Sequence, residues 1–251
     1  MLKIQRLNMD NSWWMSWDDH KILIDPWLVG SEIDGASWFN EQWHATPPMP
    51  IEELPDYEAI IVSQSYPDHC HIETLQLLND QVPIFAPKRV GEKIRKKLPQ
   101  RQIITITEES TGFKGINLSL LDPNRKIDPI YYGIVIELDQ EVVLITPHGF
   151  SLQETQLQYL KPYSIKLLIT TFSDFELPFF LGGKVNPGLK NVNELVGQLK
   201  PEVVLNTHDE QKHARGLVTK IAKTHYPDLD KIELEAPSQF IAVKDYELIS
   251  L

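Results

Sequence analysis

The feature that most constrains the fold of this chain is a pattern that occurs twice along it: hairpin-like apolar segments, then alternating strands and helices. In the first half, apolar segments at 2–7, 12–17 and 21–25 are separated by Asn and Asp residues typical of turns. The alternation that follows predicts strands at 57–63, 82–86 and 102–107 and helices at 72–78 and 89–98.

The second half begins with antiparallel strands expected at 116–121, 130–138 and 141–145, with a tight turn at Asp139-Gln140. The elements expected after them are a helix at 152–159, a strand at 165–170, a helix at 188–199, a strand at 203–205, a helix at 210–225 and a strand at 240–243. This order predicts an α+β or α/β fold in which two mixed sheets pack together with helices outside, a four-layer αβ/βα sandwich. Because no shift in composition marks a linker, we expect residues 1–251 to form a single domain.

Residues 27–55 interrupt the first pattern. The segment contains Trp27, Trp38, Phe39 and Trp43 together with two glycines and four prolines, and it shows no regular periodicity. A connection this long without regular structure is uncommon in a compact domain and is usually functional. We expect a lid loop here, and an Ω-loop whose tryptophans cover the surface is the alternative.

Charge and composition exclude several classes of protein. The formal net charge is −11 and the pI is near 5.2, which disfavours a nucleic-acid binder; the basic cluster at 88–101 is expected to be the solvated face of a helix. No apolar run approaches the roughly 20 residues of a membrane helix. A single cysteine excludes an intrachain disulfide, and we expect a cytoplasmic protein.

Three apolar strands are each followed by a histidine in the next loop: Asp68-His69 after AIIVS, His148 after EVVLIT and His208 after EVVLN. Because neighbouring strands of an α/β sheet deliver their following loops to one edge, these side chains can converge. Imidazole nitrogen and carboxylate oxygen are ligands for zinc, iron or manganese.

The segments SQSYPDHCH, LITPHGF and LNTHDE, in this order and each at a strand end, resemble the metallo-β-lactamase-fold superfamily of metal-dependent hydrolases. The family's hallmark is a strand that runs into His-x-His-x-Asp-His, followed by a Gly-Asp at another strand end and a final histidine. KILIDP near the N-terminus is similar to an early strand of the family, and the resemblance covers essentially the whole chain.

The chain departs from the family's motif at several positions. Gln64 and Tyr66 replace the first two histidines, and Asp68 and His69 match the Asp-His pair. Pro147 and His148 stand where the family has Gly-Asp, so an imidazole replaces a bridging carboxylate, while His208 matches the final histidine.

The resemblance therefore implies one divalent metal, zinc above iron or manganese, bound by Asp68, His69, His148 and His208. Two ions about 3.5–4 Å apart would repel by roughly 17–19 kcal/mol at an effective dielectric of 20, and neutral His148 offers no bridging anion to offset this. Asp68 is expected to act as both ligand and base, and Tyr66 is expected to donate a hydrogen bond to a developing oxyanion. Asp25 is expected to orient a ligand histidine.

The function implied is hydrolysis, by one metal-bound water, of a small-molecule substrate such as an apolar or bulky ester, phosphoester or lactone. The alternative is a non-catalytic, metal-poor relative that binds a ligand or partner. Without a glycine-rich phosphate loop we expect no nucleotide cofactor, and exposed aromatic residues would suit a homodimer. Cys70 is either a reactive thiol or a buried apolar residue, and His71 is either an accessory ligand or an ordinary hydrogen-bonding group at a helix start.

Overall fold

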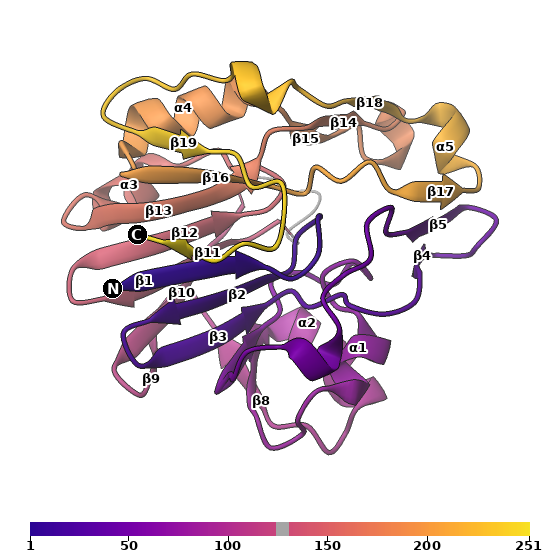
Figure 1. Ribbon diagram of the computed structural model, residues 1–251, viewed down its shortest axis with the longest axis horizontal. Coiled ribbons are helices and arrows are strands. Elements are labelled where there is room, and N and C mark those ends of the chain that lie inside the picture. Colours follow the sequence, from indigo (N-terminus) through magenta and orange to yellow (C-terminus); the bar gives the residue numbers. More distant parts are fainter. Residues whose placement is uncertain (124–130) are drawn as a thin grey trace. The chain divides into compact units, whose positions relative to one another are not determined.

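The computed structural model describes residues 1–123 and 131–251, and these residues form two compact units (Figure 1). The first unit contains Met1–Thr107, Glu210–Lys220 and Lys244–Leu251, and the second contains Glu108–Asp209 and Ile221–Val243. Each unit is built on a seven-stranded mixed sheet, so the two mixed sheets predicted from the sequence are confirmed.

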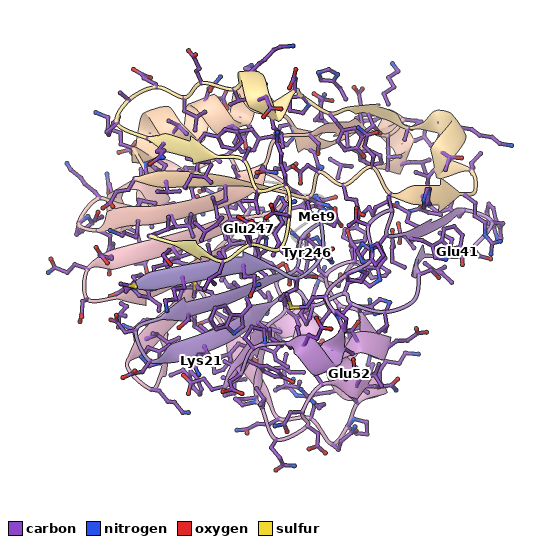
Figure 2. All side chains as sticks on the ribbon, in the orientation of Figure 1. Met9, Lys21, Glu41, Glu52, Tyr246 and Glu247 are labelled. Carbon is purple, nitrogen blue, oxygen red and sulfur yellow. The ribbon has the colours of Figure 1, made fainter. Side chains whose placement is uncertain are left out.

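The sheet of the first unit has the order β20-β1-β2-β3-β6-β7-β8. Strands β1 to β3 are antiparallel, and β3, β6, β7 and β8 run parallel to one another. Its strands are β1 (Leu2–Arg6), β2 (Trp13–Trp17), β3 (His20–Ile24), β6 (Ala59–Ile61), β7 (Ile84–Pro87), β8 (Ile103–Ile106) and β20 (Ile249–Ser250). The predicted hairpins and the alternation after them are therefore present. Tyr246, labelled in Figure 2, lies in the C-terminal segment Lys244–Leu251 of this unit. Its hydroxyl donates a hydrogen bond to the Pro47 carbonyl at 2.7 Å.

Two helices, α1 (Ile72–Leu77) and α2 (Lys88–Lys97), pack against one face of this sheet. Helix α2 is amphipathic: Val90 and Ile94 are buried among strand residues, whereas Arg95, Lys96 and Lys97 are exposed. The spacing of four between Val90 and Ile94 places both on one side of the helix. The solvated helix face expected at 88–101 is therefore confirmed for α2, whereas Arg101, which follows the helix, is buried and donates to the carbonyls of Leu78 and Asn79.

The sheet of the second unit has the order β19-β16-β13-β12-β11-β10-β9. Strands β9 to β12 form an antiparallel meander, and β12, β13, β16 and β19 are parallel. Its strands are β9 (Thr111–Phe113), β10 (Ile116–Leu121), β11 (Gly133–Leu138), β12 (Glu141–Thr146), β13 (Ser164–Thr171), β16 (Val203–Thr207) and β19 (Gln239–Ile241). Residue 130, the expected start of one strand, lies outside the described residues.

Helices α3 (Glu154–Leu160) and α4 (Leu189–Leu199) cover one face of the second sheet. Val192 and Val196, four residues apart on α4, are buried with Leu144 and Leu168 of the strands. The β11–β12 turn has φ values of 55° at Asp139 and 84° at Gln140. Positive φ at both central residues fits a type I′ hairpin turn, which matches the twist of the flanking strands.

Two three-stranded sheets complete the units. The first unit has β17-β5-β4, and the second has β15-β14-β18. Their strands are β4 (Glu32–Asp34), β5 (Asn40–Trp43), β14 (Asp174–Glu176), β15 (Lys184–Pro187), β17 (His213–Arg215) and β18 (Lys223–His225). The short helical elements are η1 (Ile51–Glu53), η2 (Phe179–Leu181), α5 (Val218–Ile221) and η3 (Leu229–Lys231).

These small sheets correct two expectations. Residues 27–55 are not devoid of regular structure, because they contain β4, β5 and η1. The helix expected at 210–225 is also wrong: His213–Arg215 pairs with β5, and α5 has only four residues. Gly216 has φ 111°, and a Cβ there would lie 2.5 Å from the Phe39 carbonyl oxygen, so strand pairing and this close approach override helix propensity.

The single domain and the lid at 27–55 stay predictions. Among the described residues, no helix is both long and apolar enough to cross a membrane.

Candidate functional site

The first group of candidate residues lies at the ends of β3 and β6 in the first unit. Asp25 directly follows β3, and its carboxylate accepts hydrogen bonds from the backbone N–H of Ser63 at 2.7 Å and from the Ser63 hydroxyl at 2.5 Å. The same carboxylate lies 2.8 Å from His69 Nδ1. One buried carboxylate therefore anchors both ends of the turn from Ser63 to His69.

The hydrogen bonds of His69 define which of its ring nitrogens can bind a metal. His69 Nδ1 faces an acceptor, Asp25 Oδ2 at 2.8 Å, and a donor, Asn11 Nδ2 at 3.1 Å. The bond to the carboxylate is charge-assisted and shorter, and the Asn11 amide already donates to the Asp68 carbonyl at 3.0 Å. We therefore assign the proton to Nδ1, which donates to Asp25, so that the lone pair of Nε2 is the one that can bind a metal.

Asp68 lies beside that lone pair. Its Oδ2 is 3.9 Å from His69 Nε2 and 4.0 Å from the ammonium of Lys212. Two ligands of one ion, each at about 2.1 Å, can be at most about 4.2 Å apart, so this spacing fits a shared cation. Lys212 also donates to Asp10 Oδ2 at 2.8 Å.

Buried charges surround Asp68. Burial, reinforced by the Asp68 carboxylate, raises the pKa of Glu32 to about 8, against the opposing effect of Lys212. Burial alone would lower the pKa of Lys212, but the carboxylates of Asp10, Asp68 and Glu32 raise it above its ordinary value. Among the charges that act on Glu32, the carboxyl groups of Asp10, Asp34 and Asp68 outnumber the single ammonium of Lys212, and this excess of acidic groups favours a bound cation.

Gln64 and Tyr66 lie in the same turn as His69. The Tyr66 carbonyl accepts from the backbone N–H groups of His69 and Cys70, at 3.1 and 2.7 Å, and so shapes the turn. Its side chain is half-buried. Gln64 is fully buried, and its Nε2 and Oε1 have no hydrogen-bond partner among the residues that the structure describes.

The second group lies at the ends of β12 and β16 in the second unit. His148 follows β12 and His208 follows β16, and the centroids of their rings are 4.4 Å apart. Their ligand nitrogens lie within 4.8 Å of each other. Tyr131 packs edge-on against His148 with a centroid distance of 4.9 Å.

A hydrogen-bonded chain orients these two histidines. His148 Nδ1–H donates to Asn186 Oδ1 at 2.7 Å, which leaves Nε2 as the ligand nitrogen. Asn186 Nδ2 donates to Ser173 Oγ, and Ser173 Oγ donates to the backbone carbonyl of His208, each at 3.0 Å. His208 has φ 58°, a left-handed conformation that a non-glycine residue keeps only where its surroundings enforce it.

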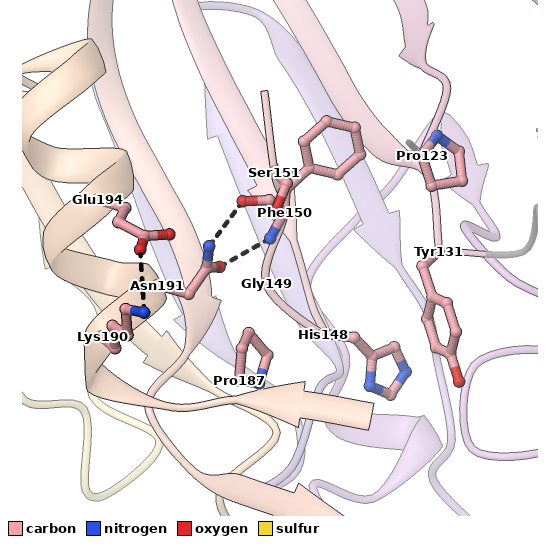
Figure 3. A pocket seen from close by; sticks show the side chains of 10 residues that line it. All are labelled: Pro123, Tyr131, His148, Gly149, Phe150, Ser151, Pro187, Lys190, Asn191 and Glu194. Atoms are coloured by element: carbon pink, nitrogen blue, oxygen red, sulfur yellow. Dashed lines mark hydrogen bonds and ion pairs between the residues drawn. The ribbon is translucent and has the colours of Figure 1, made fainter. Parts of the chain in front are cut away.

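A pocket of about 410 Å³ opens beside His148 within the second unit. Figure 3 shows Lys190 and Glu194 on one side of His148 and Tyr131 on the other. Asn191 makes two hydrogen bonds to the backbone of Phe150: its Nδ2 donates to the carbonyl and its Oδ1 accepts from the N–H, both at 2.8 Å. The lining residues are Pro123, Tyr131, His148, Gly149, Phe150, Ser151, Pro187, Lys190, Asn191 and Glu194.

The structure thus brings Asp68 to His69 within one unit and His148 to His208 within the other, and Asp25 contacts a candidate ligand as expected. Cys70 is buried, and burial raises the pKa of its thiol to about 11, so it is a packed apolar residue. His71 is the N-cap of α1 and accepts from the Thr74 N–H at 3.2 Å, which is its ordinary hydrogen-bonding role.

Sequence reasoning missed several polar residues: Asp10, Asn11, Ser173, Asn186 and Lys212. The polar turn NMDNS at a strand end was a usable signal for Asp10 and Asn11. Asn186 and Lys212 gave none, because they reach the candidate ligands through pairings remote in sequence.

Comparison with known proteins identifies the class. A family model described as a beta-lactamase superfamily domain matches residues 6–208. The metallo hydrolase Igni18 from the archaeon Ignicoccus hospitalis is similar in structure, with a TM-score of 0.70, 13% identity, and coverage of 99% of this chain and 98% of that one. An isothiocyanate hydrolase from Delia radicum gut bacteria gives a TM-score of 0.68 at 14% identity, with coverage of 99% and 98%. The metallo-beta-lactamase fold protein YhfI from Bacillus subtilis gives a TM-score of 0.63 at 13% identity, with coverage of 100% of each chain.

The fold and the family match define a member of the metallo-β-lactamase fold class, which confirms the predicted fold. The chain belongs to the beta-lactamase superfamily domain family. No curated protein matches the chain.

Proposed function

We propose that this protein is a hydrolase that uses one divalent metal ion bound by Asp68, His69, His148 and His208. The observation that carries the proposal is that each unit contains a prepared pair of ligands. His69 Nδ1 donates to Asp25 Oδ2 at 2.8 Å, and His148 Nδ1 donates to Asn186 Oδ1 at 2.7 Å. Such partners fix the tautomer that presents Nε2 to a metal.

The four proposed donor atoms suit a single divalent ion that accepts both nitrogen and oxygen ligands. Three imidazole nitrogens and one carboxylate oxygen suit zinc, iron or manganese. The acidic side chains around Glu32 (Asp10, Asp34 and Asp68) outnumber the single ammonium of Lys212, which favours a cation at this end of the site. A second divalent ion would lack the bridging anion that it needs, so we propose one ion and not two.

A divalent ion held by these residues would lower the pKa of a bound water towards neutrality and so activate it as a nucleophile. Asp68 is the base that accepts the proton from the attacking water, since its carboxylate lies beside His69 Nε2 and is stabilised by the ammonium of Lys212 at 4.0 Å. Tyr66 is our candidate donor to the oxyanion that develops on the substrate.

The pocket beside His148 supports an uncharged, partly apolar substrate. Its wall combines the rings of Tyr131, Pro123 and Pro187 with a single pair of opposite charges, Lys190 Nζ and Glu194 Oε1, 3.9 Å apart. A phosphoester would meet a carboxylate as well as an ammonium there, whereas an ester or lactone with a bulky apolar group would contact the rings. We therefore propose a carboxylic ester or lactone.

The test is hydrolysis of a panel of aryl esters, lactones and phosphodiesters by protein loaded with Zn²⁺, Fe²⁺ or Mn²⁺ and by chelator-treated protein. We expect metal-dependent turnover of esters or lactones that His148→Ala abolishes together with the bound metal. His225→Ala, at an exposed histidine of the same unit, is the matched control and should retain both. Protein that binds no metal under any of these conditions contradicts the proposal and favours a non-catalytic relative.

A further inference from the structure

Gln64 lies in the turn after β6, and its side chain is buried without a hydrogen-bond partner among the described residues. It has no exposed surface, and neither Oε1 nor Nε2 has a hydrogen-bond partner there. More than nine in ten buried polar groups in proteins are hydrogen-bonded. An amide with both ends unpaired destabilises the fold unless a bound group completes it.

The position of this amide is fixed by its neighbours. Ser63 donates to Asp25 through its backbone N–H at 2.7 Å and through its hydroxyl at 2.5 Å, and His69 donates to the same carboxylate at 2.8 Å. Gln64 follows Ser63 directly, so its Cα lies about 3.8 Å from that of an anchored residue. The unsatisfied amide therefore belongs to the turn that presents Asp68 and His69.

We propose that Gln64 Oε1 is an additional oxygen ligand of the metal, an inference that rests on the proposed function. An amide carbonyl is a hard donor. Added to three imidazoles and the Asp68 carboxylate, it gives a set of three nitrogens and two oxygens, suited to an ion that accepts more than four ligands. Gln64 thereby shifts the preference of the site from Zn²⁺ towards Mn²⁺ or Fe²⁺.

Removing the polar atoms of Gln64 should have opposite effects on two properties: it should stabilise the apo protein and weaken metal binding. Gln64→Met keeps the length of the side chain but removes both polar atoms. In chelator, this variant should melt about 2 °C or more above the wild type, because an unsatisfied buried amide is gone. Its affinity for Mn²⁺, measured by competition with a metal-binding dye, should fall about ten-fold or more, and its affinity for Zn²⁺ should fall less.

Two further variants sharpen the test. Gln64→Glu keeps the oxygen and adds a buried charge, so it should melt below the wild type in chelator and bind Mn²⁺ at least as tightly. Asn8→Leu removes a buried amide that is fully hydrogen-bonded, to Ser12 and the Trp27 carbonyl as donor and to the N–H groups of Asp10 and Ser12 as acceptor. This control should melt lower in chelator.

The outcomes separate the two proposals. If the wild type binds Mn²⁺ and Gln64→Met binds it within two-fold of the same affinity, Gln64 is not a ligand and this inference alone is overturned. If the wild type binds neither Mn²⁺ nor Zn²⁺, the proposed function is overturned and the inference with it.

Discussion

Replacing Asp25 with asparagine tests how strongly a buried carboxylate controls the metal affinity of its neighbour His69. The substitution leaves the backbone undisturbed, because Asp25 has φ 46° and asparagine tolerates this left-handed region as well as aspartate does. The new side chain keeps an oxygen for the Ser63 N–H, now 2.7 Å from Asp25 Oδ1. Its amide nitrogen then faces His69 Nδ1.

That nitrogen can only donate, so His69 must move its proton to Nε2, the atom proposed to bind the metal. Loss of such an outer partner lowers metal affinity by about 10- to 100-fold, which corresponds to about 1.4–2.7 kcal/mol. We expect this loss in competition titrations of Asp25→Asn against a metal-binding dye, and ¹⁵N chemical shifts of the histidine ring should show the change of tautomer.

The matched control is Asp56→Asn, which removes an exposed carboxylate of the same unit that lies 3.6 Å from Lys21 Nζ. It should bind metal like the wild type. If Asp25→Asn also binds with an affinity within two-fold of the wild type, the Asp25–His69 pair does not prepare a ligand and the reasoning is refuted.

Three further predictions follow from the same structure. Asn186→Ala removes the acceptor at 2.7 Å from His148 Nδ1 and should lower metal affinity about ten-fold in the same titration. Gly149→Ala places a methyl group 2.5 Å from Asn191 Oδ1 at a residue with φ 73°, and denaturant titration should show a loss of about 1–3 kcal/mol in the free energy of unfolding. Glu32, whose pKa burial raises to about 8 from 4.5, binds a proton in the folded but not the unfolded chain between these values. The stability of the apo protein should therefore fall as pH rises from about 4.5 to 8, by up to about 1.4 kcal/mol per pH unit, and Glu32→Gln should flatten this slope.

Each of these predictions has a control or a contradicting result. Asn117→Ala, at a half-buried asparagine on another strand of the second unit, should leave metal affinity unchanged. Gly197→Ala, inside α4, adds a methyl group that has no atom within 4 Å apart from neighbouring backbone of its own helix, and it should stabilise the protein by about 1 kcal/mol. An unchanged pH slope in Glu32→Gln would assign the pH dependence to another group.

Local patterns made most of the fold predictable. Helix α2 could be predicted because Val90 and Ile94 repeat at helical spacing and their neighbours are charged, and that information lies within ten residues. The region from Glu210 to His225 could not, because Gly216 and the pairing of His213–Arg215 with β5 depend on residues about 170 positions away. Non-local pairing overrode a plausible helical pattern there.

The residues of the candidate site also differ in whether local sequence predicts them. Asp68 and His69 are adjacent in sequence and follow an apolar strand, so their proximity could be predicted from the chain alone. Asn186, which orients His148, is 38 residues away on a different sheet. No periodicity relates the two, and the contact depends on how β15 packs within the second unit.

We propose that four side chains bind a single metal ion, and the other predictions on metal affinity depend on this site. The most direct measurement is a crystal structure of metal-loaded protein, with diffraction data collected on both sides of the absorption edge of the bound metal. We expect one anomalous peak about 2.0–2.2 Å from Asp68 and from Nε2 of His69, His148 and His208. Two peaks, or a peak that does not contact these four side chains, would contradict it.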